Sequence, residues 1–346
     1  MTRFVALDGG RTTTDRATPD PPLVTIDDIR AAAARLRGIT LRTPLVEFSP
    51  GPPRILLKAE SLQPIGAFKL RGAYNAIAQL DEASRARGVV THSSGNHAQG
   101  VARAARMLGV RATVVMPDDA PAVKRARVMA DGAEIVTVGV ESGAREAMAQ
   151  RLVEERDLVL IPPYDDDRVI AGQGTCGLEI AEDAAGLVMV LVPIGGGGLA
   201  SGVAVAIRAL CPDARVIGVE PELAADAAES LETGRIVRWD GAATARTIAD
   251  GTRTQAIGRR PFAHLSRWLD GVVTVTETEI AVAMRLAAEQ ARLIVEPSGA
   301  LALAAAHFRA LELGLGSATG TVVAVISGGN VDPERYRSLL ETPVPA

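Results

Sequence analysis

Residues 88–117, GVVTHSSGNHAQGVARAARMLGVRATVVMP, decide the fold class of this chain. The segment begins with a short Val-rich run at 88–93 and ends with another at 111–117. Between them, residues 97–109 are rich in Ala and Arg, which favour helix. Short strands without polar alternation are buried on both faces, so the segment predicts parallel strands covered by helices.

The same pattern recurs along the rest of the chain. Similar Val- and Ile-rich runs occur at 133–139, 158–163, 187–194, 214–221, 271–277 and 321–327. Eight strands that alternate with helices predict an α/β fold and fit two sheets better than one. We therefore predict two doubly wound, open-sheet domains: a small, mobile domain over 78–166 and a large domain made of 25–77 and 167–346.

The N-terminal segment differs in composition from the rest. Residues 1–24 are rich in Thr, Asp, Pro and Arg, which predicts a disordered leader. Thr25 and Asp28 form a capping box that predicts the start of the first helix. The leader is too poor in apolar residues for a signal peptide or membrane anchor. The longest apolar stretch, 186–207, is interrupted by Pro193 and four glycines, which argues against a membrane-spanning helix.

Composition narrows the function classes. The chain has 346 residues and a formal net charge of −4, with no dense Lys/Arg block, so nucleic acid is not expected as its partner. Cys176 and Cys211 lack the spacing of a metal or disulfide pair and are interpreted as buried thiols in a reduced compartment. We expect a cytoplasmic protein with no membrane contact. The tail after Tyr336 is too short for an allosteric domain.

Three loops follow predicted strands. In 193–202, PIGGGGLASG, four consecutive glycines open a helix, which is typical of backbone amides that approach a phosphate closely. The loop 93–97, SSGNH, offers hydroxyl and amide groups at another helix start, although a simple N-cap by Ser94 or Asn96 would also explain it. The loop 326–330, ISGGN, is uninformative alone.

A dinucleotide site is an alternative interpretation of the glycine loop. Gly195, Gly197 and Ala200 match G-x-G-x-x-G/A, and Glu220 ends the next predicted strand, where a ribose-binding acid would lie. The chain would then be an NAD-binding oxidoreductase. This interpretation leaves the other loops unexplained.

One lysine lies in an unusual place. The stretch QPIGAFKLRGAYN puts Lys69 between Phe68 and Leu70 at a predicted helix start. Withdrawal from water lowers a lysine pKa, and the neutral amine then attacks aldehydes. The alternative for Lys69 is a solvated side chain. Arg71 and Arg103 are consistent with ordinary surface charges. An amine nucleophile, a phosphate-binding turn, a hydroxyl-rich loop and a serine at a strand end are together what pyridoxal phosphate requires.

With these residues, the chain resembles the fold-type II pyridoxal-phosphate enzymes, in particular the threonine/serine dehydratase family, which includes serine racemase. The resemblance runs from about Thr25 to Tyr336. It rests on motifs that occur in the family's order: GAFKLRGA, SSGNHAQG, IPPYDDDRVIAGQGT, VPIGGGGLASG, GVEP, TIADG, EPSGA and SGGN. Eight ordered motifs outweigh the dinucleotide interpretation.

The resemblance implies a role for each matching residue. Lys69 would join the cofactor's aldehyde covalently, and Ser94 would be the second proton-transfer residue of the racemases. Residues expected to contact the cofactor are Phe68, Lys69, Asn96, at its phenolic oxygen, Gly195, Gly196, Gly197, Gly198, Leu199, Gly251 and Ser327. Residues expected to surround the substrate carboxylate are Ser93, Ser94, Gly95, Asn96 and His97.

A cation site and an assembly state are also implied. Glu220, the carbonyl of Ala224 and Asp226 match the family's divalent-cation site, where oxygen ligands suit Mg²⁺ or Ca²⁺. A solvated acidic loop is the alternative. We expect a homodimer or homotetramer.

The implied reaction is β-elimination from L-threonine and/or L-serine, giving 2-oxobutanoate or pyruvate and ammonia. Serine racemase or 3-hydroxyaspartate dehydratase activity is the alternative on the same scaffold. Ala67 replaces the family's usual serine before Phe-Lys, and Tyr164 in IPPYDD resembles catabolic threonine dehydratases. Arg145 is similar to an arginine in the racemase's small domain, and an acidic substrate would follow if it reached the site; a surface arginine is the alternative.

Overall fold

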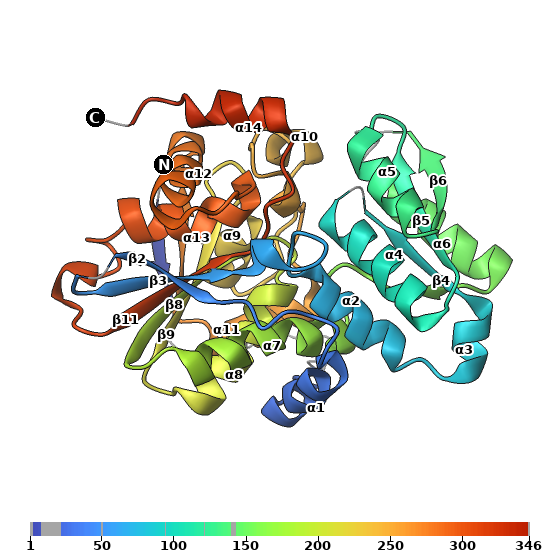
Figure 1. Ribbon diagram of the computed structural model, residues 1–346, viewed down its shortest axis with the longest axis horizontal. Coiled ribbons are helices and arrows are strands. Elements are labelled where there is room, and N and C mark those ends of the chain that lie inside the picture. The colour runs from blue at the N-terminus through green and yellow to red at the C-terminus, as the bar shows by residue number, and fades with distance from the viewer. Residues whose placement is uncertain are drawn as a thin grey trace.

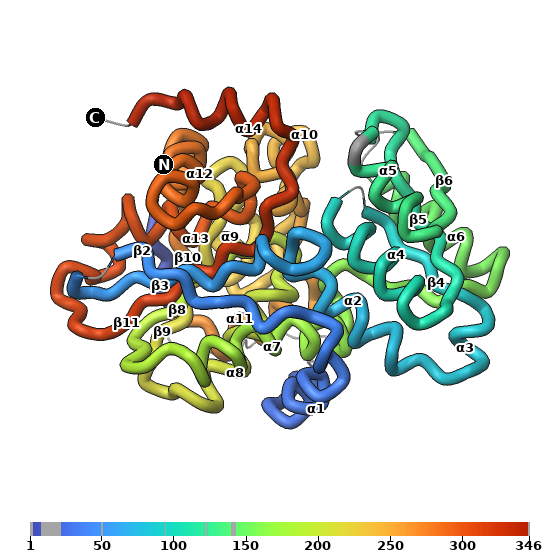
Figure 2. Tube along the Cα trace, viewed as in Figure 1, coloured from blue at the N-terminus to red at the C-terminus, as the bar shows by residue number. Residues whose placement is uncertain are grey.

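The computed structural model describes residues 3–7, 22–49, 51–93, 95–120, 122–139 and 143–344. Its strands form two separate sheets, each surrounded by helices, and the two bodies lie next to one another along the long axis of the molecule (Figures 1 and 2). The expected α/β class with two open sheets is therefore confirmed.

The larger sheet contains seven strands within the described residues. In spatial order they are β1 (Phe4–Ala6), β10 (Gly271–Val275), β9 (Arg215–Pro221), β8 (Leu187–Pro193), β11 (Thr321–Ile326), β3 (Arg54–Ala59) and β2 (Leu45–Ser49). The five central strands are parallel, and the edge strands β1 and β2 pair antiparallel with β10 and β3. Because β8, β9 and β11 run parallel, the loops that follow them meet at one edge of the sheet.

The smaller sheet is entirely parallel. Its order is β6 (Glu134–Val138), β5 (Ala112–Pro117), β4 (Val89–His92) and β7 (Val159–Leu160), in the described part of the chain. All four strands lie inside the segment 78–166 for which the sequence predicts a small domain. The exact domain boundaries stay a prediction.

Helices cover both faces of each sheet. They are α1 (Ile26–Leu36), α2 (Lys69–Ala78), α3 (Glu82–Arg87), α4 (Asn96–Leu108), α5 (Ala122–Ala130), α6 (Ala144–Arg156), α7 (Asp167–Asp183), α8 (Gly198–Leu210), α9 (Asp226–Thr233), α10 (Gly241–Thr244), α11 (Arg259–Trp268), α12 (Glu277–Ala291), α13 (Pro297–Phe308) and α14 (Pro333–Leu340), with 3₁₀ turns η1 (Glu60–Leu62), η2 (Asp250–Thr252) and η3 (Leu315–Ser317). On the larger sheet, α12 and α13 pack against one face and α7, α8 and α11 against the other. On the smaller sheet, α2 and α4 lie opposite α6. Among the described residues no helix has both the length and the apolarity needed to cross a membrane.

The N-terminus departs from the sequence prediction. Residues 4–6 are not disordered, because they form β1, which adds an edge strand to β10. Most of the rest of the predicted leader, 8–21, lies outside the described residues. The predicted capping box is present: the Thr25 hydroxyl accepts from the backbone N–H of Asp28, whose carboxylate accepts from the N–H of Thr25.

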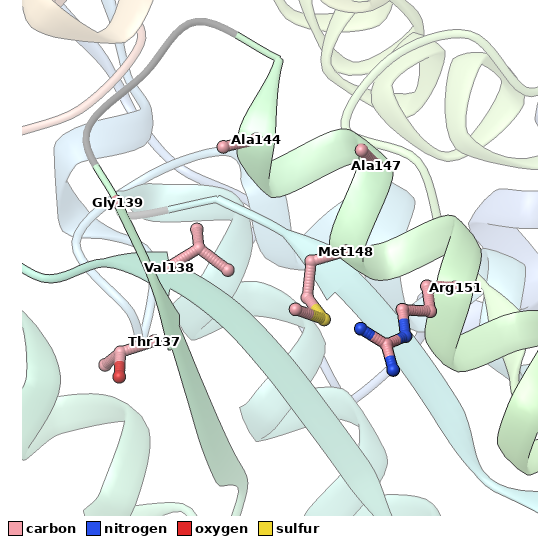
Figure 3. Close-up of a pocket in the computed structure, with 7 residues that line it drawn as sticks. All are labelled: Thr137, Val138, Gly139, Ala144, Ala147, Met148 and Arg151. Atoms are coloured by element: carbon pink, nitrogen blue, oxygen red, sulfur yellow. The ribbon is translucent and has the colours of Figure 1, made fainter.

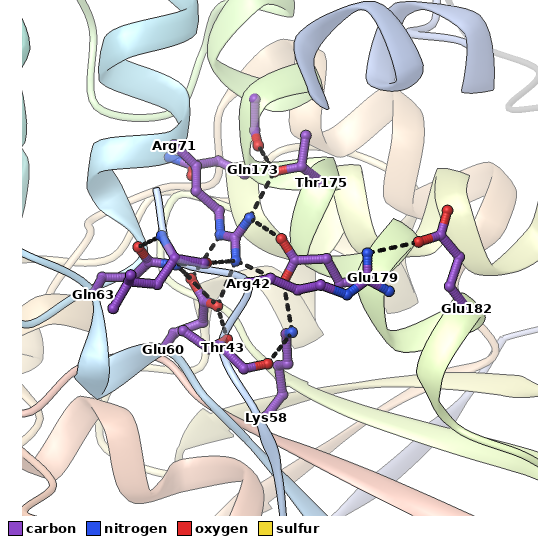
Figure 4. A network of polar contacts seen from close by, with 12 residues as sticks. Arg42, Thr43, Lys58, Glu60, Gln63, Arg71, Gln173, Thr175, Glu179 and Glu182 are labelled. Carbon is purple, nitrogen blue, oxygen red and sulfur yellow. Dashed lines mark hydrogen bonds and ion pairs between the residues drawn. The ribbon is translucent and has the colours of Figure 1, made fainter. Parts of the chain in front are cut away.

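A buried ionic network holds α2 against the larger domain (Figure 4). The Arg71 guanidinium is buried and donates to Glu60 (Nε to Oε2, 2.7 Å) and to Glu179 of α7 (Nη1 to Oε1, 2.7 Å). Lys58 of β3 donates to the same Glu179 at 2.5 Å. The alternative of a surface charge at Arg71 is therefore wrong, and this residue fixes the helix that starts at Lys69.

Replacing Arg71 by Met should destabilise the protein by about 3–5 kcal/mol, because Glu60 and Glu179 would keep only Lys58 as a buried cation. Urea unfolding followed by circular dichroism measures the effect. The control is Arg87→Met, which breaks an exposed pair with Asp157 and should cost less than about 1 kcal/mol. Equal effects for the two variants would contradict a structural role for the network.

Candidate active site

Lys69 differs from the other lysines of the chain. All three lysines, Lys58, Lys69 and Lys124, are among the described residues. Lys58 donates to the Glu179 carboxylate and Lys124 to the Asp250 carboxylate, at 2.5 and 2.8 Å. The Lys69 amine instead donates to the backbone carbonyl of Pro163 at 2.7 Å, and no carboxylate of the described residues pairs with it.

The surroundings of this amine favour its neutral form. Removal from water lowers the pKa of Lys69 to about 8, although part of the side chain keeps access to solvent. The Phe68 ring, with its centroid 5.1 Å from Nζ, makes a cation–π contact that favours the charged form, but it does not replace a counter-ion. A considerable fraction of this amine is therefore unprotonated at mildly alkaline pH and able to act as a nucleophile or base.

The glycine turn lies close to the lysine. Gly197 adopts a positive φ of +92° and caps α8, whose first backbone amides have no partner within the helix. Tyr164, next to Pro163, packs directly on Gly196, so that a Cβ there would overlap the Tyr164 ring. The segment that accepts a hydrogen bond from Lys69 therefore also covers the turn.

Two other predicted residues converge on the same region. A Cβ on Gly195 would lie 3.3 Å from the carbonyl oxygen of Gly251, so these two loops touch. The backbone N–H of Phe68 donates to the carbonyl of Ser327 at 3.1 Å, and Ala67 forms a bridge with Gly328. The Ser327 hydroxyl itself is buried and has a 3.4 Å contact with the carbonyl of Ser298. Leu199 is a core residue, so any contribution to a phosphate site would come from its backbone.

The structure describes Ser93 and residues 95–97 of the loop after β4. The backbone N–H of Gly95 donates to the Ser93 hydroxyl at 3.2 Å, and Asn96 begins α4, while Ser94 lies outside the described residues. The Nε2 atom of the His97 ring contacts the carbonyl oxygen of Ile161 at 3.0 Å. Burial, and then the Lys69 charge, lower the pKa of His97 to about 3, so the ring is neutral.

The predicted cation ligands form a buried acidic pair. Glu220 ends β9 and accepts from the backbone N–H groups of Ala227 and Ala228, at 3.1 and 2.7 Å. Asp226 begins α9, and its Oδ2 is buried without a partner among the described residues. Burial and the neighbouring Asp226 raise the pKa of Glu220, and burial raises that of Asp226 to about 7. Two crowded carboxyl groups with an unpaired oxygen fit a hard cation.

The ligand chemistry must otherwise come from backbone and water. No cluster of three or more His, Cys, Asp or Glu side chains suited to a metal occurs in the described part of the chain. Ala224, whose carbonyl is the third predicted ligand, is buried. The site is thus compatible with an ion that retains waters.

The structure also brings in polar residues that the sequence did not single out. Glu296 and Asn330 both contact Asn96: its Nδ2 donates to Glu296 at 2.6 Å, and its Oδ1 accepts from Asn330 at 2.9 Å. Both lie in motifs quoted above, EPSGA and SGGN, which were the available signal. Lys124, paired with Asp250, reaches the larger domain from α5.

A separate hollow of about 430 Å³ lies in the smaller domain (Figure 3). It is bounded by Thr137 and Val138 of β6 and by Met148 and Arg151 of α6. None of the predicted cofactor or substrate residues lines it, so it is not the candidate active site.

Comparison with known proteins identifies the family of this chain. Residues 36–328 match the family described as pyridoxal-phosphate dependent enzymes. An L-threo-3-hydroxyaspartate ammonia-lyase from Pseudomonas sp is 42% identical over 324 residues, covering 91% of this chain and 98% of that protein. Serine racemase from Schizosaccharomyces pombe is 40% identical over 322 residues, covering 92% and 98%. A crystal structure of threonine deaminase from T.th. superposes with a TM-score of 0.81 and 46% identity, covering 89% of this chain and 99% of that one. These matches favour pyridoxal phosphate over the dinucleotide alternative.

Proposed function

Because the chain belongs to the family of pyridoxal-phosphate dependent enzymes, we propose that it is an ammonia-lyase that acts on small β-hydroxy amino acids, L-serine and L-threonine among them. The observation that carries this proposal is the Lys69 amine, which has no carboxylate partner in the described structure. It donates to the carbonyl of Pro163, and the next residue, Tyr164, covers the glycine turn. Serine would give pyruvate and ammonia, and threonine 2-oxobutanoate and ammonia.

Each of the predicted residues would have a separate role in the reaction. Pyridoxal phosphate, when bound, supplies the electron sink that makes the substrate Cα–H acidic. Lys69 would hold the cofactor's aldehyde and then use its freed Nζ to take the Cα proton. Backbone amides from Gly195 to Leu199 would bind the phosphate at the start of α8. Ser327 would meet the pyridine nitrogen and Asn96 the phenolic oxygen.

The substrate carboxylate would be held by the loop 93–97. Its backbone amides at the start of α4 suit an anion, and a carboxylate fixed there orients the Cα–H bond toward the base. Phe68 and Gly251 would flank the cofactor. Ser94 would be the second proton-transfer residue if the enzyme also racemises serine.

We also propose a divalent cation, Mg²⁺ or Ca²⁺, on Glu220, the Ala224 carbonyl and Asp226. The unpaired Asp226 Oδ2 and the mutual repulsion of the two acids support it. Its role would be structural, because it neutralises the acidic pair close to the glycine turn. A cytoplasmic homodimer or homotetramer stays a prediction.

A second candidate substrate is L-threo-3-hydroxyaspartate, the substrate of two relatives that are 42% and 41% identical. Arg145 and Glu146, in the first turn of α6, lie near the substrate loop. After burial, the largest influences on the pKa of His92, which directly precedes Ser93, are the charges of Glu146 and then Arg145. An arginine at this position suits a β-carboxylate.

Lys69→Ala should abolish the visible absorbance of the purified yellow holoprotein and reduce 2-oxo acid release from L-serine to background. The side chain that would bond the aldehyde and move the Cα proton is then missing. Spectroscopy and a coupled assay measure the two effects. Lys124→Ala is the control and should keep the visible band. An active, yellow Lys69→Ala variant would refute the proposed function.

Arg145→Ala should lower kcat/KM for L-threo-3-hydroxyaspartate by about tenfold or more and leave that for L-serine nearly unchanged, because only the former has a second carboxylate to pair. Arg151→Ala, on the same helix but in an exposed pair with Glu155, is the matched control. Equal losses on both substrates would rule out Arg145 as the residue that selects acidic substrates.

Adding Mg²⁺ or Ca²⁺ should raise the thermal midpoint of the apoprotein at pH 8 more than at pH 5.5. The raised pKa of Asp226, about 7, means that protons compete with the cation at the lower pH. Differential scanning fluorimetry measures the shift. Asp226→Asn should abolish it, and Asp213→Asn, at an exposed carboxylate, should not. A cation effect that survives in Asp226→Asn would contradict the assignment.

A further inference from the structure

A buried carboxyl group, that of Glu296, contacts the side chain of Asn96. Glu296 is the residue before α13 and is only 5% exposed. Its Oε1 accepts a hydrogen bond from Asn96 Nδ2 at 2.6 Å, and its carboxylate also accepts from the backbone N–H of Asn330. The chain makes room for it: a Cβ on Gly328 would overlap Glu296 Oε1.

The other end of the Asn96 amide is held as well. Asn96 Oδ1 accepts from Asn330 Nδ2 at 2.9 Å, and the same Nδ2 contacts the carbonyl of Ile65 at 2.7 Å. Asn330 Oδ1 in turn accepts from Arg127 of α5 at 2.5 Å. Held at both ends, the amide of Asn96 cannot flip. Its nitrogen carries two hydrogens, and one of them is left for a group in the site after the bond to Glu296.

The charges around Glu296 come from several elements. Asp250 of η2 and Lys124 of α5 form an ion pair at 2.8 Å, and Asn96 of α4 and Asn330 face the carboxyl directly. Burial, followed by the negative charge of Asp250, raises the pKa of Glu296 to about 8, while Asn96 and Lys124 oppose the rise. Glu296 therefore holds a proton near neutral pH and loses it at alkaline pH.

We propose that Glu296 is a positioning residue for the reaction: it holds Asn96 so that the second N–H of its amide faces the cofactor's phenolic oxygen. The proposal rests on the proposed function, since it needs the cofactor at Lys69. Deprotonation of Glu296 turns its hydrogen bond with Asn96 into a charge-assisted one. It also places a negative charge next to Asn96, the residue proposed to contact the cofactor. The cofactor spectrum should thus report the ionisation of a residue that does not touch the cofactor.

Two substitutions separate the hydrogen bond from the charge. Glu296→Gln keeps an acceptor oxygen for Asn96 and removes the ionisable group. Glu296→Ala removes both. Glu279→Gln, which changes a buried carboxylate paired with Arg309 in the larger domain, is the control for general destabilisation.

The experiment measures the visible spectrum of each holoprotein between pH 6 and 9.5, the affinity of each apoprotein for pyridoxal phosphate, and kcat and KM for L-serine. The wild type should show a spectral step at alkaline pH, as should Glu279→Gln. Glu296→Gln should lose the step and keep its affinity within about threefold. Glu296→Ala should bind the cofactor about tenfold or more weakly and lose kcat more than KM, because the Asn96 amide is no longer held.

A further variant tests the direction in which the spectral step moves with pH. Lys124→Ala should move the step to higher pH, because Lys124 lowers the pKa of Glu296. A step that persists in Glu296→Gln would overturn the proposal, as would wild-type affinity and kcat in Glu296→Ala. If Glu296→Ala does not fold, the presence or absence of the step in Glu296→Gln still decides. A wild-type protein that binds no cofactor would instead refute the proposed function.

Discussion

The structure depends on the different hydrogen-bond partners of two cationic side chains on helix α2, Lys69 and Arg71. Arg71 is buried and surrounded by the carboxylates of Glu60 and Glu179, whereas the Lys69 amine, two residues earlier, hydrogen-bonds only to a carbonyl oxygen within the described structure. Residues two apart on a helix point in different directions, so one side chain anchors α2 in the larger domain and the other is directed at Pro163 and the glycine turn. A charged amine without a counter-ion is costly away from water. That cost lowers the Lys69 pKa and makes its amine chemically useful.

The candidate site is assembled from both sheets. Asn96 and Lys124 come from the smaller domain, and Glu296, Asn330 and Asp250 from the larger one. Two of these contacts between the domains therefore also hold the amide of Asn96. If the smaller domain opens as predicted, the contacts of Asn96 with Glu296 and Asn330 would break.

Much of this arrangement follows from local sequence, and the rest depends on distant partners. The eight apolar runs all form strands, because periodicity reports burial directly. The strands β2 and β3 were not predicted. The β3 sequence, RILLKA, contains Lys58, whose buried amine depends on two distant partners, the Glu179 carboxylate and the Thr43 carbonyl. The short β1 lies among turn-forming residues and exists through its pairing with β10. The placement of Glu296 beside Asn96, 200 positions apart, has no local signal.

Borohydride reduction of the purified holoprotein, followed by peptide mass spectrometry, tests the central claim most directly. Reduction fixes the cofactor to the amine that carries it, and the chain offers only Lys58, Lys69 and Lys124. The account predicts that the peptide with Lys69 alone gains the mass of a reduced pyridoxyl phosphate group. A label on Lys58 or Lys124, or a yellow protein that retains no label, would contradict it.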